Sequence, residues 1–320
     1  MRDYQLIKYS FIIPCYNVSK YILTAIESIP VREDIEIIII DDGSTDGLSN
    51  VISSYKGNKI IYYHKENGGV SSARNKGIDL ATGKYLLFFD GDDYYSEDLI
   101  NYLDKGFDNA QAKMITFGYN HLANNRLKYY SPGTTGIKST RVLIGQILLR
   151  QSFQCMCSFA VESDLVKNNN LRFNEVTYYY EDIEFQLKVM SLMNFVFVID
   201  KPLFFYISRK KSATNSFVNE KHFSLFYAID RLENILDADM NDSLTYFRWY
   251  SLFWIFRLAF KNGCTKKSIS ILKTLKLSNF KYNLIPCSQR RFKYNLIWLF
   301  QKFPIPFISF ILNLRAIRNN

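Results

Sequence analysis

Cysteine is scarce in this sequence, and the few cysteines form no recognisable framework. Five are spread over 320 residues. Cys155 and Cys157 lie two positions apart, but no second close pair and no nearby histidine completes a zinc set. These absences exclude a disulfide-stapled fold and a structural zinc site, so we expect reduced thiols in a cytoplasmic protein. The N-terminus is polar and its first apolar run, Phe11–Ile13, is only as long as a strand, which predicts no signal peptide.

Acidic residues are absent from the last part of the chain. Residues 243–320 hold no Asp or Glu but fourteen of the 40 Lys and Arg, with aromatic residues interleaved among them. This composition predicts contact with an anionic membrane surface through residues 243–320, with the protein peripheral on the inner face of the cell membrane. The alternative is an ordinary buried helix over residues 247–260, with the lysines facing solvent.

No apolar stretch is long enough to span a membrane. The best candidate, residues 294–314, is interrupted by Gln301, Lys302, Pro304 and Pro306, whereas a span needs about 18 or more apolar residues. We therefore expect this segment to lie in the membrane interface. No nucleic-acid partner is expected, because the aromatics sit among Leu and Ile rather than in an RNA-binding signature, and acidic strand ends would repel a polyanion.

Three predicted strands end in polar motifs. Residues 11–13 precede Pro-Cys-Tyr-Asn, residues 36–40 precede Asp-Asp-Gly-Ser-Thr-Asp, and residues 85–89 precede Asp-Gly-Asp-Asp. In an open α/β sheet the ligand binds beyond the carboxyl ends of the strands. The last motif suits a hard divalent cation bound through oxygen. The alternative is an acidic turn that caps the next helix, where Ser96, Glu97 and Asp98 are helix-start residues.

Two further segments carry polar groups at predicted helix starts. Asn67 to Gly77 is a glycine turn that leads into a helix, which brings backbone N–H groups and a cation near the same edge. Glu181 and Asp182 precede apolar positions at helical spacing, and their ordinary role would be to compensate the helix dipole. Around them we expect a strand at 114–117, a polar loop at 120–136 and a helix at 139–150.

The order of these motifs resembles the family 2 glycosyltransferases of the GT-A fold, over roughly residues 8–104. The resemblance implies an α/β fold, a Rossmann-like mixed sheet flanked by helices, with a C-terminal helical extension. It also implies a nucleotide-diphospho-sugar donor, UDP favoured, with a divalent metal, Mn or Mg, on the diphosphate. Asp42 would hydrogen-bond the base beside the backbone of Pro14, Asp90 would lie near the ribose, and Asp92, with Asp90, would bind the metal.

The resemblance implies further donor contacts. A basic loop after residues 201–206 closes over the diphosphate in related enzymes, and two residues here fit that loop. Together the remaining implied donor-binding residues are Tyr16, Asn17, Asp41, Asn67, Gly69, Arg74, Gly91, Arg209 and Ser212.

Catalytic residues also follow from the resemblance. Family members carry an E-D pair at a helix start after an F-x-E segment, and its aspartate is the catalytic base. On this chain the base would be Asp182, with Glu181 beside it. A carboxylate within hydrogen-bond reach takes the proton of the acceptor hydroxyl as it attacks the sugar carbon. In-line attack then inverts that carbon without a covalent enzyme intermediate.

We therefore predict an inverting, metal-dependent glycosyltransferase that moves one sugar to a hydroxyl of a glycan or polyprenyl-diphosphate-linked oligosaccharide in cell-surface polysaccharide biosynthesis. The processive signature Q-x-x-R-W is absent, which favours single-sugar transfer. We expect a nucleotide-sugar-binding half at 1–110, an acceptor-binding and catalytic half at 111–218, and a basic aromatic helical region at 219–320. The alternative is a nucleotide-sugar-binding regulatory protein without transferase activity. A nucleotidyltransferase would need a glycine-rich entry after the first strand, which residues 14–17 do not supply.

Overall fold

The computed structural model describes residues 6–209, 217–279, 281 and 292–308. The chain folds into two compact units. The sheet unit comprises Met1–Leu143, Ser152–Glu175 and Glu181–Ser208, and the helical unit comprises Ile144–Gln151, Val176–Tyr180 and Arg209–Asn320. Each unit has its own buried apolar residues and is described separately.

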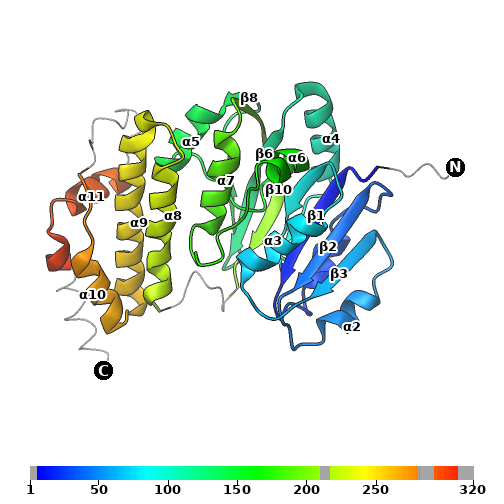
Figure 1. Ribbon diagram of the computed structural model, residues 1–320, viewed down its shortest axis with the longest axis horizontal. Helices are drawn as coiled ribbons and strands as arrows, with labels where there is room; N and C mark the ends of the chain where they lie inside the picture. Colours follow the sequence, from blue (N-terminus) through cyan, green and yellow to red (C-terminus); the bar gives the residue numbers. More distant parts are fainter. Residues whose placement is uncertain (1–5, 210–216, 280, 282–291, 309–320) are drawn as a thin grey trace. The chain divides into compact units, whose positions relative to one another are not determined.

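A mixed α/β sheet runs through the sheet unit (Figure 1). Within the described residues the strand order is β3-β2-β1-β4-β9-β6-β10-β5, with β7 added against β6 and β8 against β10. The strands are β1 Tyr9–Cys15, β2 Ile35–Asp41, β3 Lys59–His64, β4 Tyr85–Phe88, β5 Tyr94–Tyr95, β6 Met114–Ala123, β7 Arg126–Tyr130, β8 Gly136–Ser139, β9 Phe159–Glu162 and β10 Phe195–Ile207. The helices that accompany them are α1 Ile22–Glu27, α2 Leu48–Ser53, α3 Val70–Leu80, α4 Leu99–Ala110, α6 Ser163–Asn168 and α7 Glu181–Ser191. Helix α5, Thr140–Leu148, begins in the sheet unit, and its residues from Ile144 onward belong to the helical unit.

The first four strands are parallel, so their carboxyl ends share one edge of the sheet. Every residue of β2 is buried, because its sequence is a continuous isoleucine-rich run suited to a strand covered on both faces. Helix α3 packs on β1 and β2 (Figure 1). The predicted strands at 11–13, 36–40 and 114–117 are confirmed. The predicted strand at 85–89 and the predicted helix at 139–150 are confirmed with shorter bounds, Tyr85–Phe88 and Thr140–Leu148.

The predicted polar loop at 120–136 is wrong. Strand β6 continues to Ala123, and β7 returns antiparallel beside it. Asn124 and Asn125 join the two strands with positive φ angles of 49° and 59°. Asparagine tolerates positive φ angles in a two-residue hairpin turn. The polar composition of this segment led to the prediction of a loop instead. The rings of Tyr119 and Tyr130, a cross-strand pair, stack with centroids 4.9 Å apart.

A charged side chain is buried inside the parallel half of the sheet. Glu36 of β2 is completely buried. Its carboxylate accepts hydrogen bonds from the Ser10 hydroxyl (2.7 Å), from the Thr82 backbone N–H (2.6 Å) and from the Thr82 hydroxyl (2.9 Å). Ser10 in turn accepts from the Gly83 N–H (2.8 Å). This network ties β1 and β2 to the turn that leads into β4.

The helical unit is built around one long helix. Its elements are η2 Glu220–Phe223, α8 Ser224–Glu233, η3 Ala238–Met240, α9 Asn241–Asn262, α10 Lys266–Thr274 and α11 Phe292–Phe300. Helix α9 packs against both α8 and α11, and its residues Phe247, Leu252 and Ile255 are buried (Figure 1). The buried-helix alternative therefore holds for the packed face of α9.

Part of the positive charge beyond residue 243 is neutralised inside the helical unit. Arg248 pairs with Asp230 (2.5 Å) and Glu233 (2.7 Å) of α8. Lys281 lies 3.8 Å from Asp242 at the start of α9. None of the helices that the structure describes combines the length and the apolar character that crossing a bilayer requires.

Replacement of Glu36 tests the buried network. We expect Glu36→Ala to lower the free energy of unfolding by about 2–4 kcal/mol, because the buried Ser10 hydroxyl and the N–H and hydroxyl of Thr82 lose their acceptor. Urea unfolding of the parent and variant measures the difference. Glu33→Ala removes an exposed carboxylate of the same segment and should change stability by less than about 0.5 kcal/mol. Equal losses of stability in Glu36→Ala and Glu33→Ala would contradict a stabilising role for the Glu36 hydrogen bonds.

Candidate active site

The loops after β1 and β2 are bound to each other at the carboxyl edge of the sheet. The side-chain oxygen of Asn17 accepts a hydrogen bond from the Thr45 N–H (2.9 Å), and the Asn17 N–H donates to the Ser44 hydroxyl (3.0 Å). Pro14 still lies within β1, opposite Ile40, whereas Tyr16 is exposed in the loop. The two polar motifs therefore form one rim of the sheet edge.

Asp42 organises the glycine turn before α3. Its buried carboxylate accepts hydrogen bonds from the backbone N–H groups of Gly68 (2.9 Å) and Gly69 (2.7 Å) and from Lys65 Nζ (2.7 Å). The Asn67 side chain donates to the backbone carbonyl of Asp42 (2.8 Å). Gly69 has a φ of 88°, which an L side chain rarely adopts, at the N-cap of α3. The sequence reasoning missed Lys65, because nothing in its spacing pointed to this pairing.

The neighbouring carboxylate, Asp41, is held in its ionised form. Its oxygens accept from the Ser44 N–H (2.8 Å) and the Tyr62 hydroxyl, and lie 3.0 Å from Nδ1 of His64. Burial alone would raise the pKa of this carboxyl, but the hydrogen bonds from Ser44, Tyr62 and His64 lower it to about 2. Tyr62 and His64 of β3 are partners that the motif pattern did not identify.

The three carboxylates after β4 have different surroundings. Asp93 is buried and accepts a hydrogen bond from the Ile207 N–H (2.7 Å), so it joins this turn to the end of β10. Asp90 is 37% exposed, and Asp92 is half-buried. Gly91 lies against Cys15, Val18 and Ile22, where a Cβ would stand 3.2–3.3 Å from their side chains. Asp90 and Asp92 therefore keep part of their surface exposed at this turn, whereas Asp93 is buried.

The donor atoms of this turn suit a cation that protein and substrate hold together. Asp90 and Asp92 offer hard carboxylate oxygens, as Mg²⁺ and Mn²⁺ prefer. Among the described residues no group of three or more His, Cys, Asp and Glu side chains is arranged to hold a metal. Two carboxylates completed by substrate phosphates and water are a common arrangement for Mg²⁺.

A buried arginine joins this turn to the predicted catalytic pair. Arg74 of α3 is 4% exposed. One terminal nitrogen lies 3.2 Å from Asp90 and the other 3.3 Å from Glu181 at the start of α7. The guanidinium carbon lies 5.4 Å from the centre of the Phe173 ring. The structure thus brings Asp90, Arg74 and Glu181 together from three elements that are far apart in the sequence.

Burial changes the acidity of the E-D pair. It raises the pKa of the Glu181 carboxyl to about 8, and the adjacent Asp182 adds to this rise while Arg74 opposes it. Burial also raises the pKa of Asp182, against the opposing effects of Arg74 and of the Ile183 N–H, which donates to Asp182 at 2.7 Å. Strongly shifted carboxyls of this kind are typical of catalytic sites.

Asn75 anchors the segment that precedes the E-D pair. Its amide nitrogen donates to the Phe173 carbonyl (2.9 Å) and to the Glu175 carboxylate (2.9 Å), and its oxygen accepts from the Phe173 N–H (2.8 Å). Phe173 also stacks on Phe185 of α7, with centroids 4.0 Å apart. Asn75 follows Arg74 directly, so one turn of α3 holds both the F-x-E segment and the start of α7.

Two predicted donor contacts follow β10. Arg209 comes directly after Ser208 and is half-buried, and Ser212 lies outside the described residues. The end of β10 is held by the Ser208 N–H, which donates to the Leu122 carbonyl (2.9 Å), and by the Asp93 contact to Ile207.

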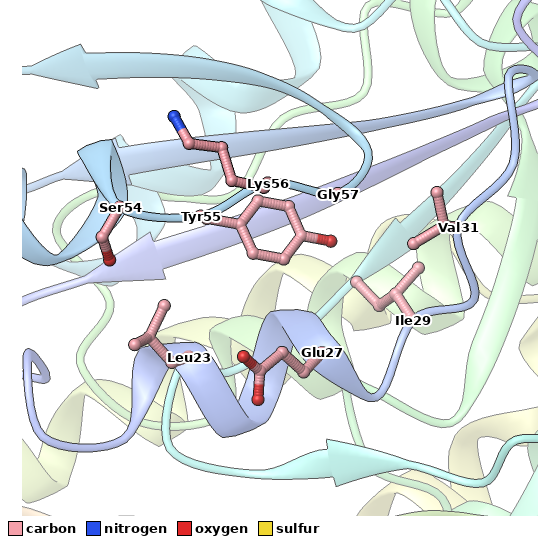
Figure 2. Close-up of a pocket in the computed structure, with 8 residues that line it drawn as sticks. All are labelled: Leu23, Glu27, Ile29, Val31, Ser54, Tyr55, Lys56 and Gly57. Atoms are coloured by element: carbon pink, nitrogen blue, oxygen red, sulfur yellow. The ribbon is translucent and has the colours of Figure 1, made fainter.

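A separate pocket of about 450 Å³ lies near the amino ends of β2 and β3 (Figure 2). Leu23 and Glu27 of α1 lie on one side of it, and the Tyr55 ring lies across from them. Val31 and Gly57, also at its wall, precede the starts of β2 and β3. The pocket is therefore at the opposite end of the parallel strands from the carboxylates.

Comparisons with known proteins agree with this geometry. Residues 10–164 match the family model described as glycosyl transferase family 2. The chain is 30% identical to the uncharacterized glycosyltransferase EpsJ of Bacillus subtilis over 217 residues, 64% of this chain and 62% of that protein. It is 32% identical over 185 residues to the minor teichoic acid biosynthesis protein GgaB of Bacillus subtilis, 52% of this chain and 19% of that protein. The chain thus spans less than two thirds of the length of both relatives.

A solved structure shares the fold. TarS residues 1–349 of S. aureus, in complex with UDP-GlcNAc, superposes with a TM-score of 0.65 at 19% sequence identity. The match covers 91% of this chain and 78% of that one. The predicted mixed α/β sheet with a C-terminal helical extension is confirmed.

The raised pKa of Glu181 predicts a specific pH dependence of stability. The native state holds a proton on Glu181 up to about pH 8, whereas the unfolded chain releases it near the ordinary value of 4.5. Native stability should therefore fall as pH rises through this window, and Glu181→Gln should lack this part of the fall. We expect the stability of the variant relative to the parent to rise by about 2 kcal/mol or more from pH 5 to 8.

Urea unfolding of the ligand-free proteins across that pH range provides the measurement. Glu97→Gln, which removes an exposed carboxylate, is the control and should change stability by less than about 0.5 kcal/mol. A pH-independent difference between Glu181→Gln and the parent would show that burial does not perturb this carboxyl.

Proposed function

Residues 10–164 belong to the family 2 glycosyl transferases, and on this premise we propose that the protein is an inverting, metal-dependent glycosyltransferase. It transfers one sugar from a nucleotide-diphospho-sugar, UDP-linked by preference, to a hydroxyl of a cell-surface glycan or its polyprenyl-diphosphate-linked precursor. The observation that carries the proposal is the Arg74 link, with Asp90 at 3.2 Å and Glu181 at 3.3 Å. Through this link the turn after β4 lies beside Glu181 and Asp182, the two carboxyls whose pKa is raised.

The donor occupies the carboxyl edge of the parallel strands in this proposal. Residues 1–110 form the nucleotide-sugar-binding half, and residues 111–218 form the acceptor-binding and catalytic half. The base and ribose lie along the rim made by Pro14, Tyr16, Asn17, Asp41 and Asp42. Because the Asp42 carboxylate already accepts from Gly68, Gly69 and Lys65, its main contribution is to hold the glycine turn in shape for the donor. The other donor contacts within the sheet unit are Asn67, Gly69, Arg74, Asp90 and Gly91.

Asp182 serves as the base. It is half-buried at the start of α7, and its pKa is raised by burial, which makes the ionised form a better proton acceptor near neutral pH. The acceptor hydroxyl gives its proton to Asp182 as its oxygen attacks the anomeric carbon. Attack on the face opposite the nucleoside diphosphate inverts the carbon. Glu181, held by Arg74, sets the orientation of the helix start.

Asp92 and Asp90 would hold a divalent cation, Mn or Mg, together with the donor diphosphate. When bound, such a cation neutralises charge on the leaving nucleoside diphosphate. Asp93 takes no part in this, because its Oδ1 accepts the Ile207 N–H.

The name of the GgaB relative, a teichoic acid biosynthesis protein, supports a cell-surface polymer as the acceptor class. Such acceptors are built on lipid carriers, which fits a protein peripheral on the cytoplasmic face of the membrane through residues 243–320. The alternative, a nucleotide-sugar-binding regulatory protein, needs the donor site but gives no role to Asp182 and its raised pKa.

Replacement of the base separates the enzyme from the binder. Asp182→Asn keeps the size of the side chain but cannot take a proton, so we expect turnover to fall about a hundredfold or more. The dissociation constant for UDP should change little. Sugar transfer and UDP binding are measured side by side, with Glu97→Gln as an exposed control. Turnover close to that of the parent would move the base to Glu181 or Glu175.

Removal of the metal-binding carboxylate tests the cofactor. We expect Asp92→Ala to abolish transfer and to weaken UDP binding only when Mn²⁺ or Mg²⁺ is present, because the diphosphate loses its bridge to the protein. UDP titrations with cation and with a chelator measure this. Asp98→Ala is the control, since that exposed side chain makes no capping hydrogen bond. Parent protein that binds UDP equally well with and without cation would contradict metal dependence.

A further inference from the structure

Helix α11 and the turn after it expose large apolar side chains. Trp298 is 37% exposed, Leu299 50%, Phe303 43% and Phe307 46%. The rings of Phe303 and Phe307 stack with centroids 5.8 Å apart. The turn that follows α11 is compact, because the Phe303 N–H donates a hydrogen bond to the carbonyl of Phe300, the last residue of the helix, at 3.1 Å. Clustered exposed side chains of this size mark an interaction surface rather than ordinary scattered exposure.

This exposed face rests on a packed aromatic layer. Phe300 of α11 is buried, and its ring lies 5.3 Å from Phe253 and 5.1 Å from Phe256 of α9. Phe256 in turn stacks on Phe260, which is 49% exposed. The layer therefore connects the exposed residues of α11 with the exposed end of α9.

Basic groups lie near aromatic rings of α11 and α9. Lys302 Nζ lies 5.1 Å above the Trp298 ring, and the Arg257 guanidinium lies 6.0 Å from the Phe253 ring. Residues 243–320 contain no Asp or Glu at all. Arg248 is neutralised by Asp230 and Glu233, so it does not belong to this set. A lysine whose stem lies along an aromatic ring keeps its ammonium at the level of lipid headgroups while the ring enters the apolar layer.

We propose that Trp298, Leu299, Phe303 and Phe307, continued by Phe260, form a face that inserts into the interface of an anionic bilayer, with Lys302 and Arg257 on the headgroups. The argument for a bilayer is the combination of Trp, Phe and Leu with exclusively basic charge. The biological role of this membrane-binding face rests on the proposed function, because a lipid-linked acceptor is presented at the surface of a bilayer. The face itself is independent of the active-site residues.

The test uses the full chain and vesicles of phosphatidylcholine, with or without phosphatidylglycerol. We expect the parent protein to sediment with the anionic vesicles and to be released as salt rises, because headgroup attraction is screened. Trp298→Ser and Phe303→Ser should each weaken binding about tenfold or more, because each removes a large apolar side chain from the inserted face. Lys302→Glu should weaken binding and reduce its salt dependence.

Tyr227→Ser is the matched control, because Tyr227 is 64% exposed on α8 of the same unit and belongs to no part of this face. It should bind vesicles as the parent does. Hydrolysis of a soluble UDP-sugar should be unchanged in all four variants, so loss of vesicle binding with intact hydrolysis supports the proposal separately from the proposed function. Equal binding of Trp298→Ser and parent, binding indifferent to phosphatidylglycerol, or a dimer dissociated by Phe303→Ser without vesicle binding would each overturn it.

Discussion

The buried guanidinium of Arg74 is the constraint on which the candidate site depends. A charge removed from water must be paired, and here its partners come from two distant segments, Asp90 after β4 and Glu181 at the start of α7. The same turn of α3 carries Asn75. The side chain of Asn75 holds the Phe173–Glu175 segment by hydrogen bonds to the Phe173 backbone and the Glu175 carboxylate. Movement of α7 away from α3 would remove the Glu181 contact of the guanidinium. The position of the E-D pair relative to the turn after β4 is therefore tied to the contacts of Arg74.

The carboxylates of the site differ because their surroundings differ. Asp41 is held ionised by hydrogen-bond donors that outweigh its burial, whereas Glu181 has few donors and a second carboxyl beside it, so burial dominates. Asp93 serves the fold through the Ile207 N–H, whereas Asp90 and Asp92 remain partly exposed at the same turn. Carboxyl side chains thus serve as a structural acceptor at Asp93, as an ionised group at Asp41 and as a buried group of raised pKa at Glu181.

The helical unit combines two kinds of aromatic surface. Phe247 and Phe300 build its interior, while Trp298 and Phe303 remain at the surface on the layer that Phe300 forms. The basic residues also have two kinds of surroundings. Arg248 forms ion pairs with Asp230 and Glu233, whereas Lys302 lies over the exposed Trp298 ring. Composition alone could not make this division, because both groups have the same residue types at similar spacing.

The sequence by itself determined the parallel strands and the polar motifs that follow them. Continuous apolar runs such as Ile37–Ile40 leave few alternatives to a buried strand, and polar motifs directly after such strands must meet at one edge. It did not determine the hairpin at Asn124 and Asn125, which depends on a positive φ at both positions. Only the tertiary structure decided that Arg74 faces Asp90 and Glu181, that Lys65 pairs with Asp42, and that Asp93 is taken by β10. These pairings join residues up to 114 positions apart, and contacts of that range follow from how elements pack rather than from any local pattern. The pKa of Glu181 was decided in the same way, since it depends on the water excluded by neighbouring elements.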